Sequence, residues 1–204
     1  MASCCGRTQV DVGDTFDPRI VRPEVVSLLR ECQRRVPFHL GGGAALAGVH
    51  LRHRLSADAD LFVHGQEAHR ELVRQLPEIG AANGTPVTVV RDGGSFVRAS
   101  LELPDGATEL DVVFDSVPGI EPAQAPIEGV VVDLLFLDRA GFAPEHDLEL
   151  AMRKDAGTDP GVLAWLLGQF PVEPLPVTLV PLDADELRRF RDDLQERFRR
   201  RAVP

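Results

Sequence analysis

The chain has 204 residues, of which 44% are hydrophobic and 26% charged, an ordinary composition for a globular domain with a substantial core. Its formal net charge of −10 argues against a protein that coats nucleic acid through bulk electrostatics, although a local basic groove is compatible with it. No apolar run approaches the ~18 residues of a membrane helix, and the N-terminus lacks a secretory pattern. The three cysteines show neither zinc spacing nor an even number for disulfides, so we expect a cytoplasmic protein.

The chain begins with a predicted helix, a strand and a glycine turn. The helix is expected from Pro23, a residue favoured in a first helical turn, to just before Pro37. A short buried strand at 38–40 runs into the triplet Gly41–Gly43. Residues 44–54 are small and apolar and predict a helix that starts at this turn.

Further strands and one helix are expected before residue 116. They are a strand at 58–63, a surface helix at 66–76 and strands at 85–91, 96–103 and 109–115. The last two strands alternate apolar and polar residues, so each has one apolar face. We therefore predict an α/β (α+β) core over residues 18–118, with a small mixed sheet flanked by helices.

The second half of the chain is predicted to be helical. Residues 116–129 are rich in proline and glycine and indicate a connector, whereas the apolar run at 131–139 fits either a helix or a strand. Pro144 and Pro160 each occupy the place of a first helical residue. The final helix carries an apolar stripe formed by Leu187, Phe190, Leu194 and Phe198. Residues 119–204 are expected to form a helical region packed on the core.

Two aspartates on one predicted strand are the strongest candidates for chemistry. Asp58 and Asp60 are two residues apart, so their side chains share a face of the strand. Neighbouring carboxylates repel unless a cation lies between them, and oxygen ligands suit Mg²⁺ or Mn²⁺. A third carboxylate could come from another strand, with Asp111 as the best candidate and Glu109 next. On spacing alone, a solvated edge or turn is the commoner explanation of this pattern.

The glycine triplet strengthens the metal interpretation through its position in the chain. Gly41–Gly43 follows a strand and opens a helix, so its backbone N–H groups and the helix N-terminus could receive phosphate. The triplet lacks the Walker A and G-x-G-x-x-G patterns, and a plain tight turn would explain it in isolation. However, the order of strand, turn, helix and aspartate strand predicts a phosphate cradle beside a metal pair, as transfer from a metal-bound triphosphate requires.

Two segments resemble a known enzyme family. Residues 38–46 and 53–62 are similar to the nucleotidyltransferases of the abortive-infection type IV toxin family (AbiEii/AbiGii), which belongs to the DNA polymerase β-like superfamily. The resemblance implies a nucleotidyltransferase fold in which Asp58 and Asp60 hold Mg²⁺ and a later strand supplies a third acid.

The resemblance also implies roles for the residues around the aspartates. Gly42 and Gly43 would face the triphosphate, and Arg54 and Ser56 would lie near its phosphates. Asp111 would ligate a metal or help to deprotonate an incoming hydroxyl. The implied reaction moves a nucleotidyl group from an NTP to a tRNA 3′ end or a protein hydroxyl, and a toxin role would imply a cognate antitoxin.

Departures from the family pattern keep two alternatives open. Ala44 stands where the family often has threonine or serine, and residues 122–129 lack the lysine and arginine that commonly precede an Asp-Leu-x-x-Leu helix, here begun by Asp133. These departures favour a degenerate, non-catalytic module that binds nucleotide or a partner protein. A metal-dependent phosphohydrolase using the same carboxylates is a third hypothesis.

The remaining distinctive residues are expected to be structural. Lys154 is interpreted as a solvated residue at a helix end, and Trp165 as helix core rather than a base-stacking platform. The six histidines show no zinc spacing. The basic tail at 197–201 fits a contact with RNA and a solvated helix end equally well.

Overall fold

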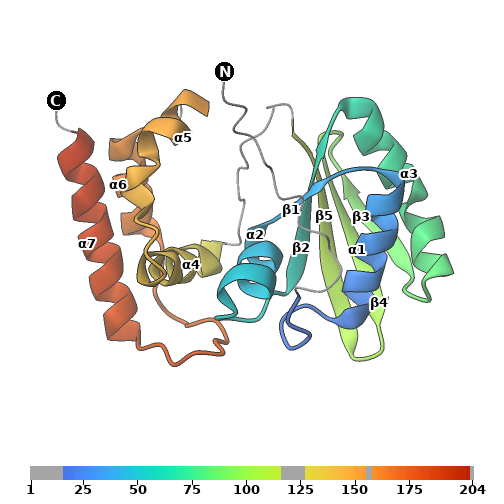
Figure 1. The fold of residues 1–204 in the computed structure, drawn as a ribbon, viewed down its shortest axis with the longest axis horizontal. Coiled ribbons are helices and arrows are strands. Elements are labelled where there is room, and N and C mark those ends of the chain that lie inside the picture. The colour runs from blue at the N-terminus through green and yellow to red at the C-terminus, as the bar shows by residue number, and fades with distance from the viewer. Residues whose placement is uncertain (1–15, 116–126, 155–157, 203–204) are drawn as a thin grey trace, which may run out of the picture.

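The computed structural model describes residues 16–115, 127–154 and 158–202. A five-stranded sheet lies at the centre, with α1 and α3 on one side of it and the C-terminal helices on the other (Figure 1). Within these residues, no helix is both long and apolar enough to cross a membrane.

The sheet is mixed, as predicted. Its strands are β1 (His39–Gly41), β2 (Asp58–His64), β3 (Val87–Asp92), β4 (Phe96–Leu103) and β5 (Gly106–Asp115). Their order is β1-β2-β5-β4-β3, in which β2 and β5 are parallel and the other neighbours are antiparallel. The parallel pair places the start of β2 beside the middle of β5, where the acidic residues of both strands lie.

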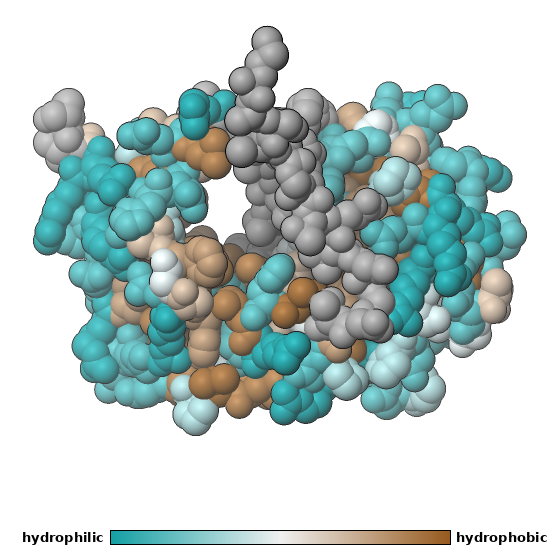
Figure 2. All heavy atoms as spheres, viewed as in Figure 1, coloured by the Kyte–Doolittle hydropathy of each residue, from teal (hydrophilic) through white to brown (hydrophobic). Residues whose placement is uncertain are grey.

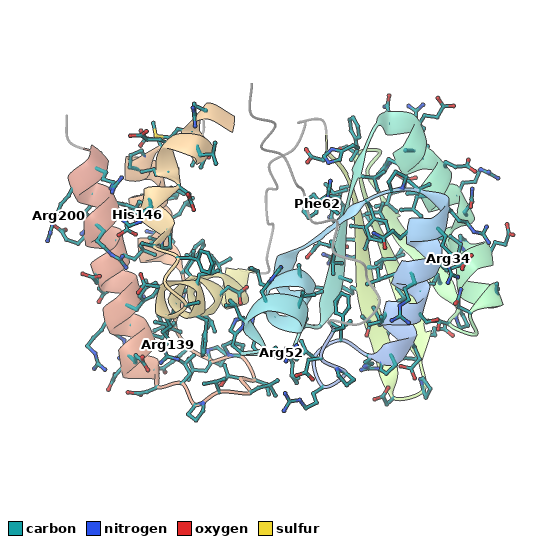
Figure 3. All side chains as sticks on the ribbon, viewed as in Figure 1. Arg34, Arg52, Phe62, Arg139, His146 and Arg200 are labelled. Carbon is teal, nitrogen blue, oxygen red and sulfur yellow. The ribbon has the colours of Figure 1, made fainter. Side chains whose placement is uncertain are left out.

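Two amphipathic helices cover the apolar face of the sheet. They are α1 (Pro23–Arg35) and α3 (Gln66–Ala82), and their side chains interleave with those of the strands (Figure 3). The fully buried leucines of this layer include Leu28, Leu29, Leu72, Leu76 and Leu61. Burying each such side chain contributes about 1.5–3 kcal/mol, so this layer holds the sheet in place.

The segment after β1 differs from the single helix predicted at 44–54. A short helix, α2 (Gly42–Ala45), begins two residues earlier, and the following turns form a π-helix, η1 (Leu46–Leu51). The segment ends at Arg52, which has a left-handed φ of 51°. Wide turns of this kind are frequent at functional sites, and this one directly follows the glycine triplet.

The C-terminal half is helical. It contains α4 (Ile127–Arg139), the 3₁₀ turn η2 (Pro144–His146), α5 (Leu148–Lys154), α6 (Pro160–Gln169) and α7 (Ala184–Ala202). The ambiguous run at 131–139 is therefore part of a helix. The helix expected from Pro144 is only a single turn there, and the α-helix proper begins at Leu148.

The buried apolar residues form two clusters, one between the sheet and its helices and one among α4 to α7. Residues 53–55 and 177–179 join the two halves: the Leu179 N–H donates to the His53 carbonyl at 2.7 Å, and Arg54 forms a bridge with Thr178. The predicted boundary at residues 118–119 lies outside the described residues, so the domain division stays a prediction. The surface is hollowed between the two halves (Figure 2).

Candidate functional site

A single row of residues crosses all five strands at the level of the predicted site. Gly41 pairs with Asp60, Asp60 with Asp111, Asp111 with Arg98, and Arg98 with Arg91. The residues that flank this row on β2, β5 and β4 are buried against α1 and α3. Because side chains alternate along a strand, the charged side chains of the row project from the opposite face of the sheet.

Asp60 is the most deeply placed carboxylate in this row. Asp60 is only 4% exposed, and its Oδ2 atom is buried without a hydrogen-bond partner. Burial, together with the negative charges of Asp58 and Asp111, raises the pKa of Asp60 to about 7. A buried carboxylate oxygen without a partner is costly, so a cation bound at this atom would stabilise the protein.

Asp58 lies on the same face and is half-buried. Burial raises its pKa, and the negative charge of Asp111 acts in the same direction. The Ser56 hydroxyl lies 3.1 Å from the Asp58 carbonyl oxygen and 3.5 Å from its Oδ1. Ser56 therefore lies beside the aspartate pair, and its predicted place near the phosphates stays a prediction.

The glycine turn packs directly against these groups. Gly42 has a φ of 60°, and a Cβ atom there would overlap Oδ2 of Asp60. A Cβ atom on Gly43 would lie 2.6 Å from Nη2 of Arg54 and 2.9 Å from the Ser56 hydroxyl. The positive φ of Gly42 therefore favours glycine, Gly43 packs closely on the Arg54 and Ser56 side chains, and the structure brings the predicted phosphate-binding residues to one place beside Asp60.

Arg54 is held by a carboxylate that the sequence did not single out as a site residue. It is buried, and its Nε and Nη2 donate to Oδ1 and Oδ2 of Asp133 on α4 at 2.7 and 2.8 Å. Nε2 of His53 lies 2.6 Å from the same Oδ1. Burial alone would raise the pKa of Asp133, but the hydrogen bonds from Arg54 and His53 outweigh it and lower that pKa. The positive charge of Arg54 is thus already matched by a full ion pair.

Asp111 is engaged in a similar way by Arg98. Nε and Nη2 of Arg98 each donate to one Asp111 oxygen at 2.8 Å, and its Nη1 lies 2.9 Å from Oε2 of Glu109. These hydrogen bonds, foremost those to Asp111, raise the pKa of Arg98. Asp111 is therefore close to Asp60 but turned toward an arginine.

The acidic residues fit a cation unequally. Asp58 and Asp60 offer carboxylate oxygens, one of them without a partner, which is the donor chemistry that Mg²⁺ prefers. No group of three or more acidic, histidine or cysteine side chains in the described parts of the chain is arranged to hold a metal ion. Asp58 and Asp60 thus share one face, whereas Asp111 is paired with Arg98, and the predicted metal ligands stay a prediction.

Sequence reasoning missed the partners of Asp111 and Arg54, namely Arg98, Asp133 and His53. One signal was present, because Asp133 is the only charged residue within the apolar run 130–137, and a charge in such a run requires a buried partner. Its partner lies 79 positions earlier in the chain. Arg98 gave no such signal, since it alternates normally on the polar face of its strand.

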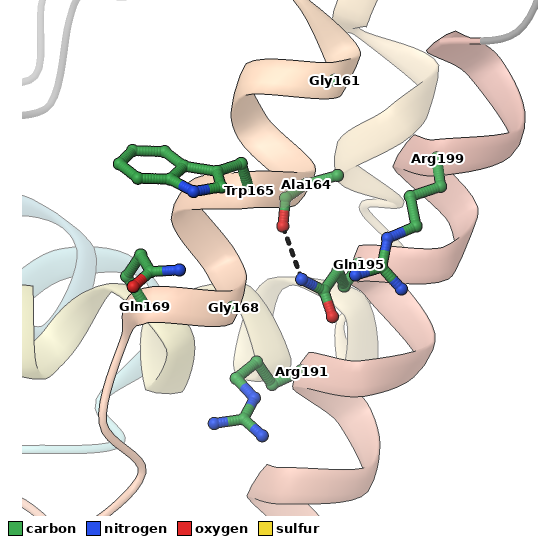
Figure 4. A pocket seen from close by; sticks show the side chains of 8 residues that line it. All are labelled: Gly161, Ala164, Trp165, Gly168, Gln169, Arg191, Gln195 and Arg199. Atoms are coloured by element: carbon green, nitrogen blue, oxygen red, sulfur yellow. Dashed lines mark hydrogen bonds between the residues drawn. The ribbon is translucent and has the colours of Figure 1, made fainter.

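Trp165 was predicted to lie in the core of its helix packing, and this prediction is wrong. The residue is 62% exposed and borders a shallow hollow of about 480 Å³ between α6 and α7, together with Gln169, Arg191 and Arg199 (Figure 4). Helix α6 is apolar all round, so only one of its sides can face α7. Ala164 occupies that side, and its carbonyl accepts a 2.7 Å hydrogen bond from Gln195.

Comparison with known proteins agrees with the geometry of the site. The sequence model of a family described as the nucleotidyl transferase AbiEii toxin of type IV toxin–antitoxin systems matches residues 27–129. This segment contains the glycine turn and all three predicted acidic residues. No curated protein matches the chain.

Two solved structures from Helicobacter pylori are distantly similar to the chain. One is a candidate nucleotidyltransferase, with 19% identity over 86% of this chain and 93% of that one and a TM-score of 0.40. The other is JHP933, with 19% identity over 90% and 94% of the two chains and a TM-score of 0.43. Scores at this level indicate only a loose overall likeness.

Proposed function

Because this chain belongs to the AbiEii nucleotidyl transferase toxin family, we propose that it transfers a nucleotidyl group from a nucleoside triphosphate to an acceptor hydroxyl. The reaction depends on Mg²⁺ or Mn²⁺ held by Asp58 and Asp60. The observation that carries this proposal is the unpartnered Oδ2 of Asp60 against Gly42, at a turn with no room for a side chain.

The glycine turn binds the triphosphate in this proposal. The N-terminus of the helix that starts at Gly42 carries free N–H groups and a positive partial charge. The missing Cβ atoms of Gly42 and Gly43 allow phosphate oxygens to approach the backbone closely. Ser56 and Arg54 border the same space, and the guanidinium, although paired with Asp133, adds a donor face beside Gly43.

The acidic residues direct the chemistry. Asp58 and Asp60 would hold the divalent ion, which would supply positive charge to offset the negative charge of the phosphates. The acceptor oxygen attacks the α-phosphorus, the bond from that phosphorus to the bridging oxygen breaks, and pyrophosphate leaves. Asp111 lies beside Asp60, and each of its oxygens, although it accepts from Arg98, has a further lone pair with which to orient the acceptor hydroxyl or receive its proton. The acceptor is a tRNA 3′ end or a protein hydroxyl.

The family also supports a biological context. We propose that the chain acts in the cytoplasm as the toxin of a toxin–antitoxin pair, with a cognate antitoxin that opposes its activity. In that setting the acidic net charge favours a defined acceptor over general binding to nucleic acid.

A non-catalytic module is the second candidate function. The observation that favours it is the two-point ion pair of Arg54 with Asp133, which leaves the glycine turn without an uncommitted cation among the described site residues. Under this hypothesis the chain binds a nucleotide or a partner protein and turns nothing over.

Incubation with each α-labelled NTP in turn separates these functions. The purified protein is mixed with Mg²⁺ and either total bacterial RNA or a lysate, beside Asp58→Ala and Asp60→Ala proteins. Asp105→Asn is the matched control, because this aspartate is exposed in the turn between β4 and β5.

We expect an RNA or protein band to acquire label with wild type and with the control, and not with the site variants. Free nucleotide or phosphate without a labelled acceptor would instead indicate a phosphohydrolase. NTP binding without any turnover would indicate the non-catalytic module.

A further inference from the structure

We propose that Arg98 limits the site to a single divalent cation, bound at Asp58 and Asp60, by occupying the place beside Asp111 where a second cation would otherwise bind. This inference rests on the proposed function for its metal, but it concerns what Arg98 does to the number of cations. Arg98 is thus a positioning residue, which acts on the site through its contact with Asp111.

The contacts of Arg98 leave no carboxylate oxygen of Asp111 free of it. The two residues are direct cross-strand partners on β4 and β5, and the planar guanidinium meets both oxygens at 2.8 Å. Such two-point pairs are stronger and more directional than single contacts. A cation that bound Asp111 would have to displace a fully formed ion pair.

Two further contacts fix the orientation of the guanidinium. Nη1 lies 2.9 Å from Oε2 of Glu109, the residue two positions before Asp111. The guanidinium carbon lies 5.7 Å from the centroid of the Phe96 ring on the same face of β4, within the range of a cation–π contact. Arg98 is therefore held from three sides, and Glu109 is drawn into the same cluster.

Among the described acidic residues of the site (Asp58, Asp60, Glu109 and Asp111), Asp58 and Asp60 are the two that no arginine contacts. Asp60 has the unpartnered Oδ2, and the described residues contain no set of three convergent metal ligands. A pair of carboxylates matches the charge of one divalent ion. The positive charge beside Asp111 is already supplied by Arg98, which neutralises this carboxylate but cannot act as a Lewis acid.

Counting bound Mn²⁺ by electron paramagnetic resonance at pH 8 tests the inference. Wild-type protein is titrated with Mn²⁺ alone, and the Asp58→Asn/Asp60→Asn protein gives the background of surface binding. We expect one Mn²⁺ per wild-type chain above this background. Arg98→Met keeps the apolar stem, frees Asp111 and Glu109, and is expected to raise the number to two.

Arg91→Met is the matched control. Arg91 is the cross-strand neighbour of Arg98 and also lies near the Phe96 ring, at 5.9 Å, so its loss changes the charge of the face equally without freeing Asp111. We expect Arg91→Met protein to bind one Mn²⁺ ion per chain, as wild type does. Arg98→Lys, which keeps the charge but loses the two-point contact, serves if Arg98→Met does not fold, and it is expected to bind a second Mn²⁺ at least tenfold more weakly than the first.

Two results would overturn the inference. The first is a wild-type chain that binds two Mn²⁺ ions or none. The second is folded Arg98→Met or Arg98→Lys protein that still binds only one Mn²⁺ ion per chain. The readout is independent of turnover. A chain that binds one Mn²⁺ but labels no acceptor would contradict the proposed function and leave this inference standing. A wild-type chain that transfers the nucleotidyl group with two bound Mn²⁺ ions would overturn this inference and leave the proposed function standing.

Discussion

At Asp60, burial and negative neighbours oppose ionisation together. The folded pKa is about 7 against an ordinary value of 3.8, so the folded protein holds an extra proton between these two pH values. The contribution of this carboxyl to stability is therefore lost as the pH rises toward and through 7. Asp58 on β2 and Asp111 on β5 repel the Asp60 carboxylate, and Arg98 and Arg54 attract it.

Asp60→Asn should consequently stabilise the metal-free protein at high pH. In EDTA at pH 8 we expect the free energy of unfolding to rise by about 1–3 kcal/mol, because a shift of one pKa unit corresponds to about 1.4 kcal/mol. At pH 4 the two proteins should melt together. Thermal melts at both pH values measure this, with Asp105→Asn as the control. An Asp60→Asn protein that is no more stable than wild type at pH 8 would contradict the burial argument.

Gly42 tests the close approach of backbone and carboxylate. A side chain there meets both the positive φ and Oδ2 of Asp60, whereas Gly84 has a similar φ of 68° with nothing within 4 Å of the place that a Cβ atom would take. Gly84→Ala should cost only the conformational term, about 1 kcal/mol. Gly42→Ala should cost more and abolish transfer. Urea unfolding and the labelling assay compare them, and equal behaviour of the two variants would refute the steric role of Gly42.

Among the elements, α4 has the most direct link to the site. Asp133 on this helix binds Arg54, which borders the glycine turn, and the pair is buried together with His53. The helical half of the molecule thus determines where Arg54 lies. This link explains why Asp133 interrupts the apolar run 130–137 of this helix.

Asp133→Asn should therefore destabilise the protein strongly. Removing one partner leaves the buried Arg54 uncompensated, which typically costs about 3–5 kcal/mol. Asp138→Asn on the same helix is the control, since its ion pair with Arg197 is partly exposed and should be worth no more than about 1 kcal/mol. Denaturant titration measures both. A similar loss of unfolding free energy in the two variants would mean that the buried ion pair contributes no more to stability than the exposed one.

Most of the elements could be predicted because their signals are local. Alternation identified the strands at 96–103 and 109–115, and the glycine triplet before Asp58 predicted where the candidate site lies. The partners could not be predicted, because Arg54 and Asp133 are 79 positions apart and the fold alone brings them together. Trp165 was misplaced for a related reason, since an apolar helix does not reveal which of its sides another helix covers.

For the whole molecule, the site lies where the two halves meet. The sheet with α1 and α3 supplies the carboxylates and the glycine turn. The C-terminal half supplies Asp133 on α4 and the segment at 177–179 between α6 and α7. The face of the sheet opposite α1 and α3 carries the row from Gly41 to Arg91. In the proposed reaction, a triphosphate bound at the glycine end would leave the arginine end of this row for the acceptor.

The central claim is that Asp58, Asp60 and the glycine turn form one nucleotidyl transfer site. It is tested most directly by supplying the preferred NTP with the label at the α-phosphate or at the γ-phosphate, to wild type and to Asp60→Asn protein. We predict that the α-label enters the acceptor and the γ-label leaves as pyrophosphate with wild type, and that Asp60→Asn lowers both by at least a hundredfold. Transfer that is unchanged in Asp60→Asn, or γ-label in the acceptor, would contradict the account.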